Sequence, residues 1–494
     1  MTAENFFESS LAKEKSPLQD HCGLVAIYAK KDKPLFELGL RGLHTLQTRG
    51  NDGAGMVCVD SQQNIITHKD RGLISEVFPE SVSDRLGKIS AKTFIFQVRY
   101  GTSGNFSPAN VQPFIGENHK EPFVVAHNGQ FANESSQEYA ENSDTLIFTQ
   151  QLAERNEISW DWKIIKTLEE KRGAWSLVIV APNAMYLARD PLGIRPLTYT
   201  NLNGAWVAAS ETSALDQMGA TGYTEVMPGQ IVKITDARPE VIQSSNNYKS
   251  ALCIFEDVYI CDGNSRVHRP RSTSSEVNYS PTIEEIRRRC GEILAKESPL
   301  TTDQVDFVIG IPGTAIPGGQ AYAKALDLPY IQAIFDRNSP DEERRTFMTA
   351  EISTIPQKVQ RHFIFNEKAL HGSRVVLIDD SIVRGNISKG LNSLLKESYG
   401  VVETHWRVLS PRIDNRCHLG VNTRKSTELI AARYDSNLKL IEAEIGADSL
   451  AYLSPQGLRK AITGNPNVEG FCMGCMTGQT YPIDEYGQLI NQHE

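Results

Sequence analysis

The stretch RVVLIDDSIVRGNISKGLNSLLKE, residues 374–397, decides the fold class of the second half of the chain. An apolar run ends in Asp379 and Asp380, a short loop follows, and a helical pattern opens near Ser388. A buried strand, a loop and a helix in this order are typical of a parallel α/β sheet. Backbone N–H groups and the helix dipole would meet at one spot, which suits a phosphate. Two carboxylates at the strand's end suit a ribose diol or a magnesium-bound pyrophosphate, whereas a lone Asp-Asp pair would more simply be an acidic turn.

The surrounding sequence repeats this rhythm. We expect a helix over 281–297, a strand over 306–312, a helix over 318–326 and a helix over 388–396. The segment from about 465, which carries FCMGCMTG, is loop-like and too short to fold alone, so it must pack back on the body. The second half is therefore predicted to be a mostly parallel α/β domain.

The first half is rich in short apolar segments separated by Gly, Asn and Pro. Strands are expected over 22–29, 53–59, 92–100, 122–129, 175–181, 185–190, 205–210 and 229–234. Helical patterns over 35–47 and 143–154 make this half sheets with packed helices. Because the polar segment 239–279 breaks the periodicity, the domain boundary is placed there.

Composition excludes several classes of protein. With 494 residues, a net charge of -9 and 40% hydrophobic residues, the chain is predicted to be globular, with roughly two to four domains. No basic excess exists to bind nucleic acid, and no apolar run approaches the roughly 18 residues of a membrane span. The start, MTAENFFESS, lacks the pattern of a secretory signal, so we expect a cytoplasmic protein. Eight cysteines are too sparse for a disulfide scaffold and favour metal binding or catalysis.

The string DDSIVRG after an apolar strand resembles the phosphoribosyl-pyrophosphate motif of glutamine phosphoribosyl-pyrophosphate amidotransferases. The resemblance implies that the two aspartates bind the ribose hydroxyls, that the loop after Arg-Gly holds the 5′-phosphate, and that Mg²⁺ takes part. The phosphoribosyl and magnesium residues that it implies are Thr314, Asp379, Asp380, Ser381, Arg384, Gly385 and Ser388.

The resemblance extends to the first half, where Cys22 begins the string CGLVAIY. The family places its nucleophilic cysteine at such a strand after removing a propeptide, so residues 1–21 would be cleaved. A freed α-amine, with a pKa near 8, can accept the thiol proton without a histidine. The thiolate would then attack the glutamine carboxamide.

Other strings complete the implied glutamine site. In AHNGQ, Asn128 and Gly129 match the oxyanion hole. Arg99 matches the clamp on the glutamine carboxylate, and Asp144 the partner of its ammonium; LQTRGNDGAG supplies Arg49 as a further glutamine-binding residue. Each piece alone is weak, since Asn-Gly is usually a turn and an Arg on a strand usually faces solvent.

Four cysteines resemble the ligands of the family's iron-sulfur subclass: Cys253, Cys417, Cys472 and Cys475. The resemblance implies a 4Fe-4S cluster that joins the domain junction, the second domain and the tail. A zinc tetrathiolate or a redox Cys-x-x-Cys pair are the alternatives.

The departures from the family pattern gather in the second half. Gly313 replaces a carboxylate, and acidic residues 341–343 stand where a pyrophosphate-facing loop should avoid negative charge. Gln360 and His362 replace an Arg and a Lys, and Asn386 with Ile387 replaces a Thr-Thr pair. We infer that glutamine hydrolysis is retained, whereas the acceptor is the part that has room to differ.

The fold expected from the resemblance has two domains: an N-terminal-nucleophile glutaminase αββα sandwich and a phosphoribosyltransferase-type parallel α/β domain. The boundaries are a propeptide at 1–21, the glutaminase domain at 22–245, the phosphoribosyltransferase-type domain at 246–464 and a cysteine-bearing tail at 465–494.

Three functions follow from these residues. The first is transfer of ammonia from glutamine to C1 of phosphoribosyl pyrophosphate, which gives phosphoribosylamine, glutamate and pyrophosphate. The second is the same glutamine chemistry with a different acceptor in a specialised pathway. The third is a non-catalytic sensor of a nucleotide or of oxygen, and the retained oxyanion residues argue against it. The resemblance also implies a homo-oligomer, commonly a tetramer, and inhibition by purine nucleotides.

Overall fold

The computed structural model describes residues 22–100, 108–132, 143–244, 249–266, 281–337, 363–421, 423, 425–479, 481–484, 488 and 490. The predicted propeptide, the acidic residues 341–343 and residues 360 and 362 lie outside this part of the chain. No helix in the described part is long and apolar enough to cross a membrane.

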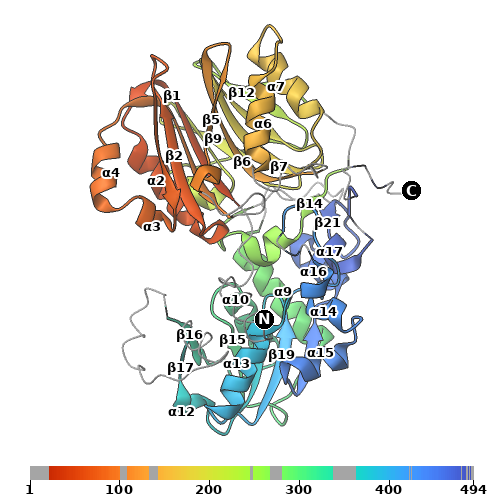
Figure 1. Ribbon diagram of the computed structural model, residues 1–494. Helices are drawn as coiled ribbons and strands as arrows, with labels where there is room; N and C mark the ends of the chain where they lie inside the picture. Colours follow the sequence, from red (N-terminus) through yellow and green to blue (C-terminus); the bar gives the residue numbers. More distant parts are fainter. Residues whose placement is uncertain are drawn as a thin grey trace, which may run out of the picture.

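The first domain stacks two antiparallel sheets face to face, with helices on both outer sides (Figure 1). One sheet has the order β11-β9-β10-β1-β4-β2-β3 and the other the order β13-β12-β8-β7-β6-β5. The strands of the first are β1 (Gly23–Lys33), β2 (Gly53–Val59), β3 (Ile65–Arg71), β4 (Ala91–Arg99), β9 (Thr198–Leu202), β10 (Ala205–Ala209) and β11 (Thr224–Glu225). Those of the second are β5 (Phe114–Asn118), β6 (Glu121–Phe131), β7 (Gly173–Ala181), β8 (Ala184–Arg189), β12 (Ile231–Ile234) and β13 (Glu240–Gln243).

Alternating side chains divide the core of this domain into layers. One apolar cluster lies between the first sheet and α2 (Phe36–Thr45), α3 (Ile74–Val77), α4 (Glu80–Leu86) and α8 (Thr212–Gln217). A second fills the space between the sheets, and a third lies between the second sheet and α6 (Asp144–Ala153) with α7 (Trp160–Glu169). The αββα sandwich and each strand predicted for this half are confirmed.

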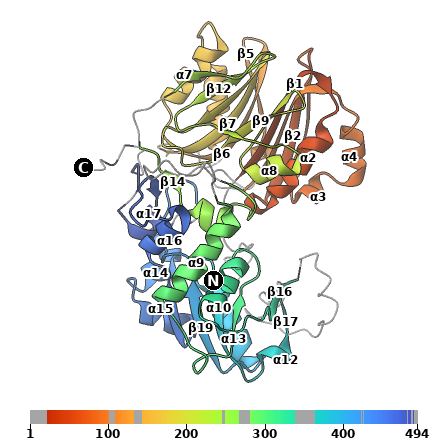
Figure 2. The ribbon, with the colours of Figure 1, turned by 180° about the vertical axis from the view of Figure 1, so that it is seen from behind.

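The second domain is built on a parallel sheet of order β15-β18-β19-β20 (Figure 2). Its strands are β15 (Phe307–Gly310), β18 (Arg374–Asp379), β19 (Glu403–Val408) and β20 (Ser449–Tyr452). The helices around it are α9 (Ile283–Glu297), α10 (Ile316–Ala325), α12 (Glu367–Leu370), α13 (Asn386–Glu397), α14 (Ile430–Arg433), α15 (Leu438–Ile445) and α16 (Pro455–Thr463). A separate antiparallel pair joins β16 (Ile334–Asp336) to β17 (Phe363–Phe365). The predicted parallel α/β domain is confirmed, and β18 has the bounds of the apolar run that predicted it.

The junction between the domains differs from the polar linker expected over 239–279. Within it, β14 (Leu252–Cys253) and the π-helical turn η3 (Glu256–Ile260) are largely buried. The tail returns to this junction, because β21 (Phe471–Cys472) pairs in parallel with β14, and α17 (Gly474–Thr477) follows. The expectation that the tail packs back on the body is confirmed, and the part of the polar segment 239–279 that holds β14 and η3 is buried, which its polar composition did not predict.

Candidate active site and the domain junction

Cys22 immediately precedes β1, and the charges of Arg49, Arg99 and Asp144 act on its thiol. Its thiol is buried and lies 3.9 Å from the Tyr100 carbonyl oxygen, to which it donates. Burial raises the pKa of the thiol, and the charges of Arg99 and Asp144 act on it in opposite directions. A raised pKa means that the thiol needs a proton acceptor before it can attack a carboxamide.

Asn128 and Gly129 lie on β6, opposite Ser176 and Trp175 of β7. The Asn128 side chain is fully buried, and neither its nitrogen nor its oxygen finds a hydrogen-bond partner among the residues that the structure describes. Gly129 has φ +141°, and a Cβ there would stand 2.0 Å from the Ala174 carbonyl oxygen, so only glycine fits. An unpaired buried amide is costly, and an oxyanion is the partner that would satisfy its N–H group.

Asp144 opens α6 and is held by the backbone. Its two carboxylate oxygens accept from the Thr145 amide at 2.8 Å and the Phe131 amide at 3.1 Å. His127 stacks on Phe131, and its Nδ1 lies 2.9 Å from the Thr145 hydroxyl. Burial lowers the pKa of His127 to about 4, so the ring is neutral at physiological pH. Asp144 is thus fixed beside a neutral histidine, where an ammonium group would meet its charge.

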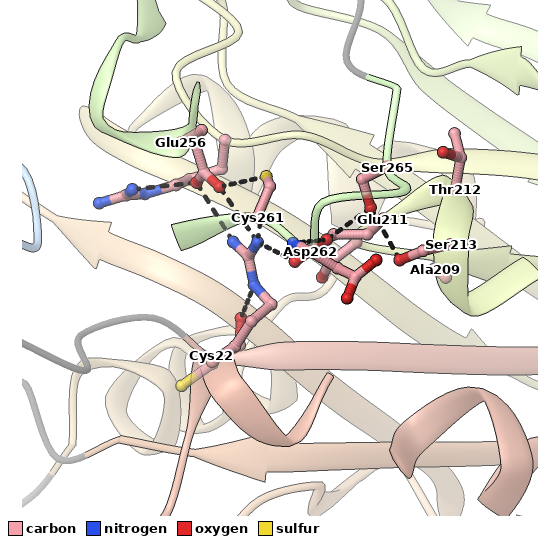
Figure 3. A network of polar contacts seen from close by, with 12 residues as sticks. Cys22, Ala209, Glu211, Thr212, Ser213, Glu256, Cys261, Asp262 and Ser265 are labelled. Atoms are coloured by element: carbon pink, nitrogen blue, oxygen red, sulfur yellow. Dashed lines mark hydrogen bonds and ion pairs between the residues drawn. The ribbon is translucent and has the colours of Figure 1, made fainter. Parts of the chain in front are cut away.

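Arg49 is placed differently from the other predicted glutamine-binding residues. Its guanidinium is fully buried and Nε donates to the Cys22 carbonyl oxygen at 3.2 Å. One terminal nitrogen reaches Glu211 at 2.6 Å and Glu256 at 3.0 Å, and the other reaches Glu256 at 3.2 Å (Figure 3). The guanidinium of Arg49 thus joins the backbone of Cys22 to two buried carboxylates, and its role in binding glutamine stays a prediction.

The acid pair of the second domain lies at the carboxyl end of β18. Asp380 accepts hydrogen bonds from the Thr314 hydroxyl and, at 2.7 Å, from the Ser381 hydroxyl. Asp379 accepts from the Asp380 amide at 2.9 Å. Burial and the charge of Asp380 raise the pKa of Asp379 well above its usual range. The structure therefore brings Thr314, Asp379, Asp380 and Ser381 together where parallel α/β sheets bind ligands.

The loop after these acids turns into α13. Gly385 has φ +80°, and a Cβ there would stand 2.4 Å from Cδ1 of Ile430. Ser388 is buried in the first turn of the helix. Arg384 pairs with Glu428 at 3.0 Å, so its charge is partly balanced within the protein. The loop keeps the shape for an anion, but its arginine already has a protein partner.

The four cysteines predicted as cluster ligands share one neighbourhood at the junction. Cys253 and Cys472 are register partners on β14 and β21, and Cys475 lies in α17. Besides burial, which acts most strongly, Cys253 and Cys417 each raise the pKa of both Cys472 and Cys475. Within the described ranges, no set of three or more His, Cys, Asp or Glu side chains is arranged to hold a metal ion. The thiols are neighbours, but their sulfur atoms do not converge on one point.

Two residues that matter at this junction were missed from the sequence. Arg287 lies on the buried face of α9, where its Nη2 donates to the Cys261 carbonyl oxygen at 2.8 Å. Burial raises the pKa of Asp380, and the charge of Arg287 offsets part of that rise. Glu256 binds Arg49 from within a segment interpreted as linker. An arginine at an apolar position of the predicted helix 281–297 was the one available signal for Arg287.

Known proteins match the chain over nearly its whole length. A glutamine amidotransferase domain model matches residues 103–217. The amidophosphoribosyltransferase of Bacillus subtilis (strain 168) is 32% identical over 488 residues, which cover 96% of this chain and 97% of the relative. That of Synechococcus elongatus is 33% identical and covers 98% of this chain and 95% of its own.

Solved structures agree with these relatives. The B. subtilis glutamine phosphoribosylpyrophosphate amidotransferase, complexed with ADP and GMP, matches with a TM-score of 0.80 and 31% identity, over 95% of this chain and 99% of the other. A structure described as the allosteric regulatory enzyme of purine biosynthesis matches with a TM-score of 0.81 and 31% identity, over 95% and 98%. The sandwich, the parallel domain and the full-length similarity together show that this chain is an enzyme that belongs to the amidophosphoribosyltransferase family.

Proposed function

We propose that the chain transfers ammonia from glutamine to C1 of phosphoribosyl pyrophosphate and releases phosphoribosylamine, glutamate and pyrophosphate. Two features of β6 support the glutamine half of this proposal: the unpaired Asn128 amide and the backbone of Gly129. The third feature is the Cys22 thiol, on which the charges of Arg99 and Asp144 both act. Such a set supplies a nucleophile, oxyanion donors and a charge for each end of an amino acid.

In this mechanism Cys22 attacks the carboxamide carbon after its proton has moved to an amine. Burial raises the thiol pKa, so removal of residues 1–21 would matter: it frees an α-amine on Cys22 itself. Asn128 and Gly129 would donate to the oxyanion, ammonia would leave, and water would release glutamate from the thioester. Arg99 would hold the glutamine carboxylate and Asp144 its ammonium.

The acceptor half rests on the acid pair. Asp379 and Asp380 would accept from the ribose hydroxyls, with Thr314 and Ser381 orienting Asp380. Gly385 and Ser388 would place the amides of α13 around the 5′-phosphate. Mg²⁺, if bound with pyrophosphate, would neutralise the leaving group's charge, and the carboxylate oxygens of Asp379 and Asp380 are ligands that suit a hard cation.

One observation favours a different acceptor as the second candidate. Arg384 is paired with Glu428, which leaves less positive charge for a pyrophosphate, and Gly313 has no carboxylate to offer to a magnesium ion bound with it. A less anionic acceptor would suit that balance better than a pyrophosphate.

The deciding experiment measures glutamate and pyrophosphate together, with glutamine and Mg²⁺, in the presence and absence of phosphoribosyl pyrophosphate. Glutamine-dependent pyrophosphate release supports the first candidate, and glutamate without pyrophosphate supports the second. Cys22→Ala should reduce glutamate release by roughly 10³-fold or more while leaving pyrophosphate release from added ammonium chloride intact. Intact mass shows in the same sample whether residues 1–21 are removed.

We also propose that Cys253, Cys417, Cys472 and Cys475 hold a 4Fe-4S cluster. Their shared neighbourhood and mutual electrostatic effect support a four-thiolate donor set, although the sulfurs would have to converge. When bound, the cluster would cross-link the tail to the junction. Iron and acid-labile sulfide should be found in anaerobically purified protein and lost in Cys475→Ser; zinc in their place would refute the cluster. Light scattering would test the homo-oligomer that the family resemblance implies.

A further inference from the structure

The buried cluster around Arg49 contains residues from both sides of the domain boundary. Arg49 and Glu211 come from the first domain, whereas Glu256 and Cys261 come from the junction segment (Figure 3). The side chains of Arg49, Glu211 and Glu256 are fully enclosed. Solvent screens buried ion pairs much less than exposed ones, so the attraction between these charges holds the side chains firmly in place.

Glu256 uses both carboxylate oxygens within this cluster. One accepts from Arg49 at 3.2 Å and from Arg195 at 3.3 Å, and the other accepts from Arg49 at 3.0 Å and from the Cys261 thiol at 3.1 Å. Burial raises the pKa of Glu256, but the charges of Arg49 and Arg195 bring that pKa below its ordinary value. Glu256 is therefore an anion that fixes the guanidinium plane of Arg49.

That plane in turn fixes the nucleophile. Arg49 Nε donates to the carbonyl oxygen of Cys22, the residue whose thiol reacts. Glu211 holds one terminal nitrogen from the first domain, but among the described residues Glu256 alone contacts both terminal nitrogens. Rotation of the guanidinium would move the Cys22 carbonyl and, with it, the thiol's direction of attack.

The junction segment is gripped from its other side by the second domain. Arg287 of α9 donates to the Val258 carbonyl oxygen at 3.1 Å and to the Cys261 carbonyl oxygen at 2.8 Å. The charge of the same arginine acts on Asp380. Residues 256–261 thus lie between Arg49, which holds the backbone of Cys22, and Arg287 of the second domain.

We propose that Glu256 is a positioning residue for glutamine hydrolysis: acting through Arg49, it sets the position of Cys22 from outside the glutaminase domain. The inference rests on the proposed role of Cys22 as the nucleophile. It gives the junction segment a part in catalysis in addition to its part in packing.

The test compares two reactions of the full-length enzyme. Glu256→Gln keeps the shape but removes the charge, and we expect kcat for glutamine-dependent pyrophosphate release to fall by about 10- to 100-fold, with KM for glutamine nearly unchanged. Pyrophosphate release from ammonium chloride, which bypasses Cys22, should stay within about 2-fold of wild type. An equal loss in both reactions, or no loss in either, would overturn the proposal.

A milder pair of variants covers the case in which Glu256→Gln fails to fold because it breaks a buried ion pair. Cys261→Ala removes one donor to Glu256, and Cys261→Ser restores a hydroxyl donor. The alanine variant should lose glutamine-dependent kcat and the serine variant should recover it; identical behaviour would contradict the positioning role. Asp161→Asn, which breaks the outer Lys233–Asp161 pair of 2.8 Å, is the matched control. If the wild-type enzyme released glutamate no faster than Cys22→Ala, the proposed role of Cys22 as the nucleophile would be refuted instead.

Discussion

The two half-sites keep their polar groups in different states. In the glutamine half the unpaired group is a neutral amide, Asn128, on a rigid strand between packed layers. In the acceptor half the groups are carboxylates, and hydroxyls of Thr314 and Ser381 already bind Asp380. A neutral donor such as Asn128 can stay unpaired in the free enzyme, whereas Asp380 must exchange its hydroxyl partners for those of the substrate when the substrate binds. If these residues act as proposed, the described part of the glutamine site is preformed, whereas the acceptor site has to be completed by its ligands.

Removing the side-chain amide of Asn128 should give the largest effect. Asn128→Ala should lower kcat for glutamine hydrolysis by about 10²- to 10³-fold with little change in KM, because the amide acts on charge that develops in the transition state. Steady-state glutamate release measures this. Asn118→Ala is the control: Asn118 donates to backbone carbonyls at the end of α6, so its loss should lower the melting temperature and spare kcat. A change confined to KM would mean that Asn128 binds the ground state.

Altering the acid pair should give a smaller and separable effect. Asp379→Asn should slow pyrophosphate release by roughly 10- to 100-fold, from ammonia as well as from glutamine, because one ribose acceptor is lost. Basal glutamate release without acceptor should be unaffected. Asp306→Asn breaks an exposed pair with Arg374 at the opposite end of β18 and should change neither rate. Loss of basal glutamate release in Asp379→Asn would show that the half-sites are not independent.

The smallest effect concerns acid stability. The pKa of His127 falls from 6.5 to about 4 on folding, so the unfolded chain binds the extra proton between these values. Stability from this group is complete above pH 6.5 and is lost as pH falls towards 4, by up to about 3 kcal/mol. Urea unfolding from pH 7 to 4.5 should show a shallower decline for His127→Gln than for wild type. The exposed His119→Gln should follow wild type, and parallel curves for all three would contradict the assignment.

The fold could be predicted where it depends on local pattern. The apolar run before Asp379 predicted the bounds of β18, and the apolar segment 122–129 predicted β6, because each strand is buried along most of its own length. Glu256 could not be found in this way, because its importance depends on Arg49, which lies far away in the sequence. The same holds for Arg49, because its partners Glu211 and Glu256 are also far away in the sequence.

The pairing of β14 with β21 has a consequence for synthesis of the chain. The ribosome completes all of the glutaminase domain long before Phe471 and Cys472 emerge. These two residues nevertheless form the strand that pairs with Leu252 and Cys253. Until then the segment that ends in Glu256 lacks one neighbour. The nascent first domain can thus be folded without its junction being finished, which would delay full glutamine hydrolysis until the enzyme that consumes the ammonia is complete.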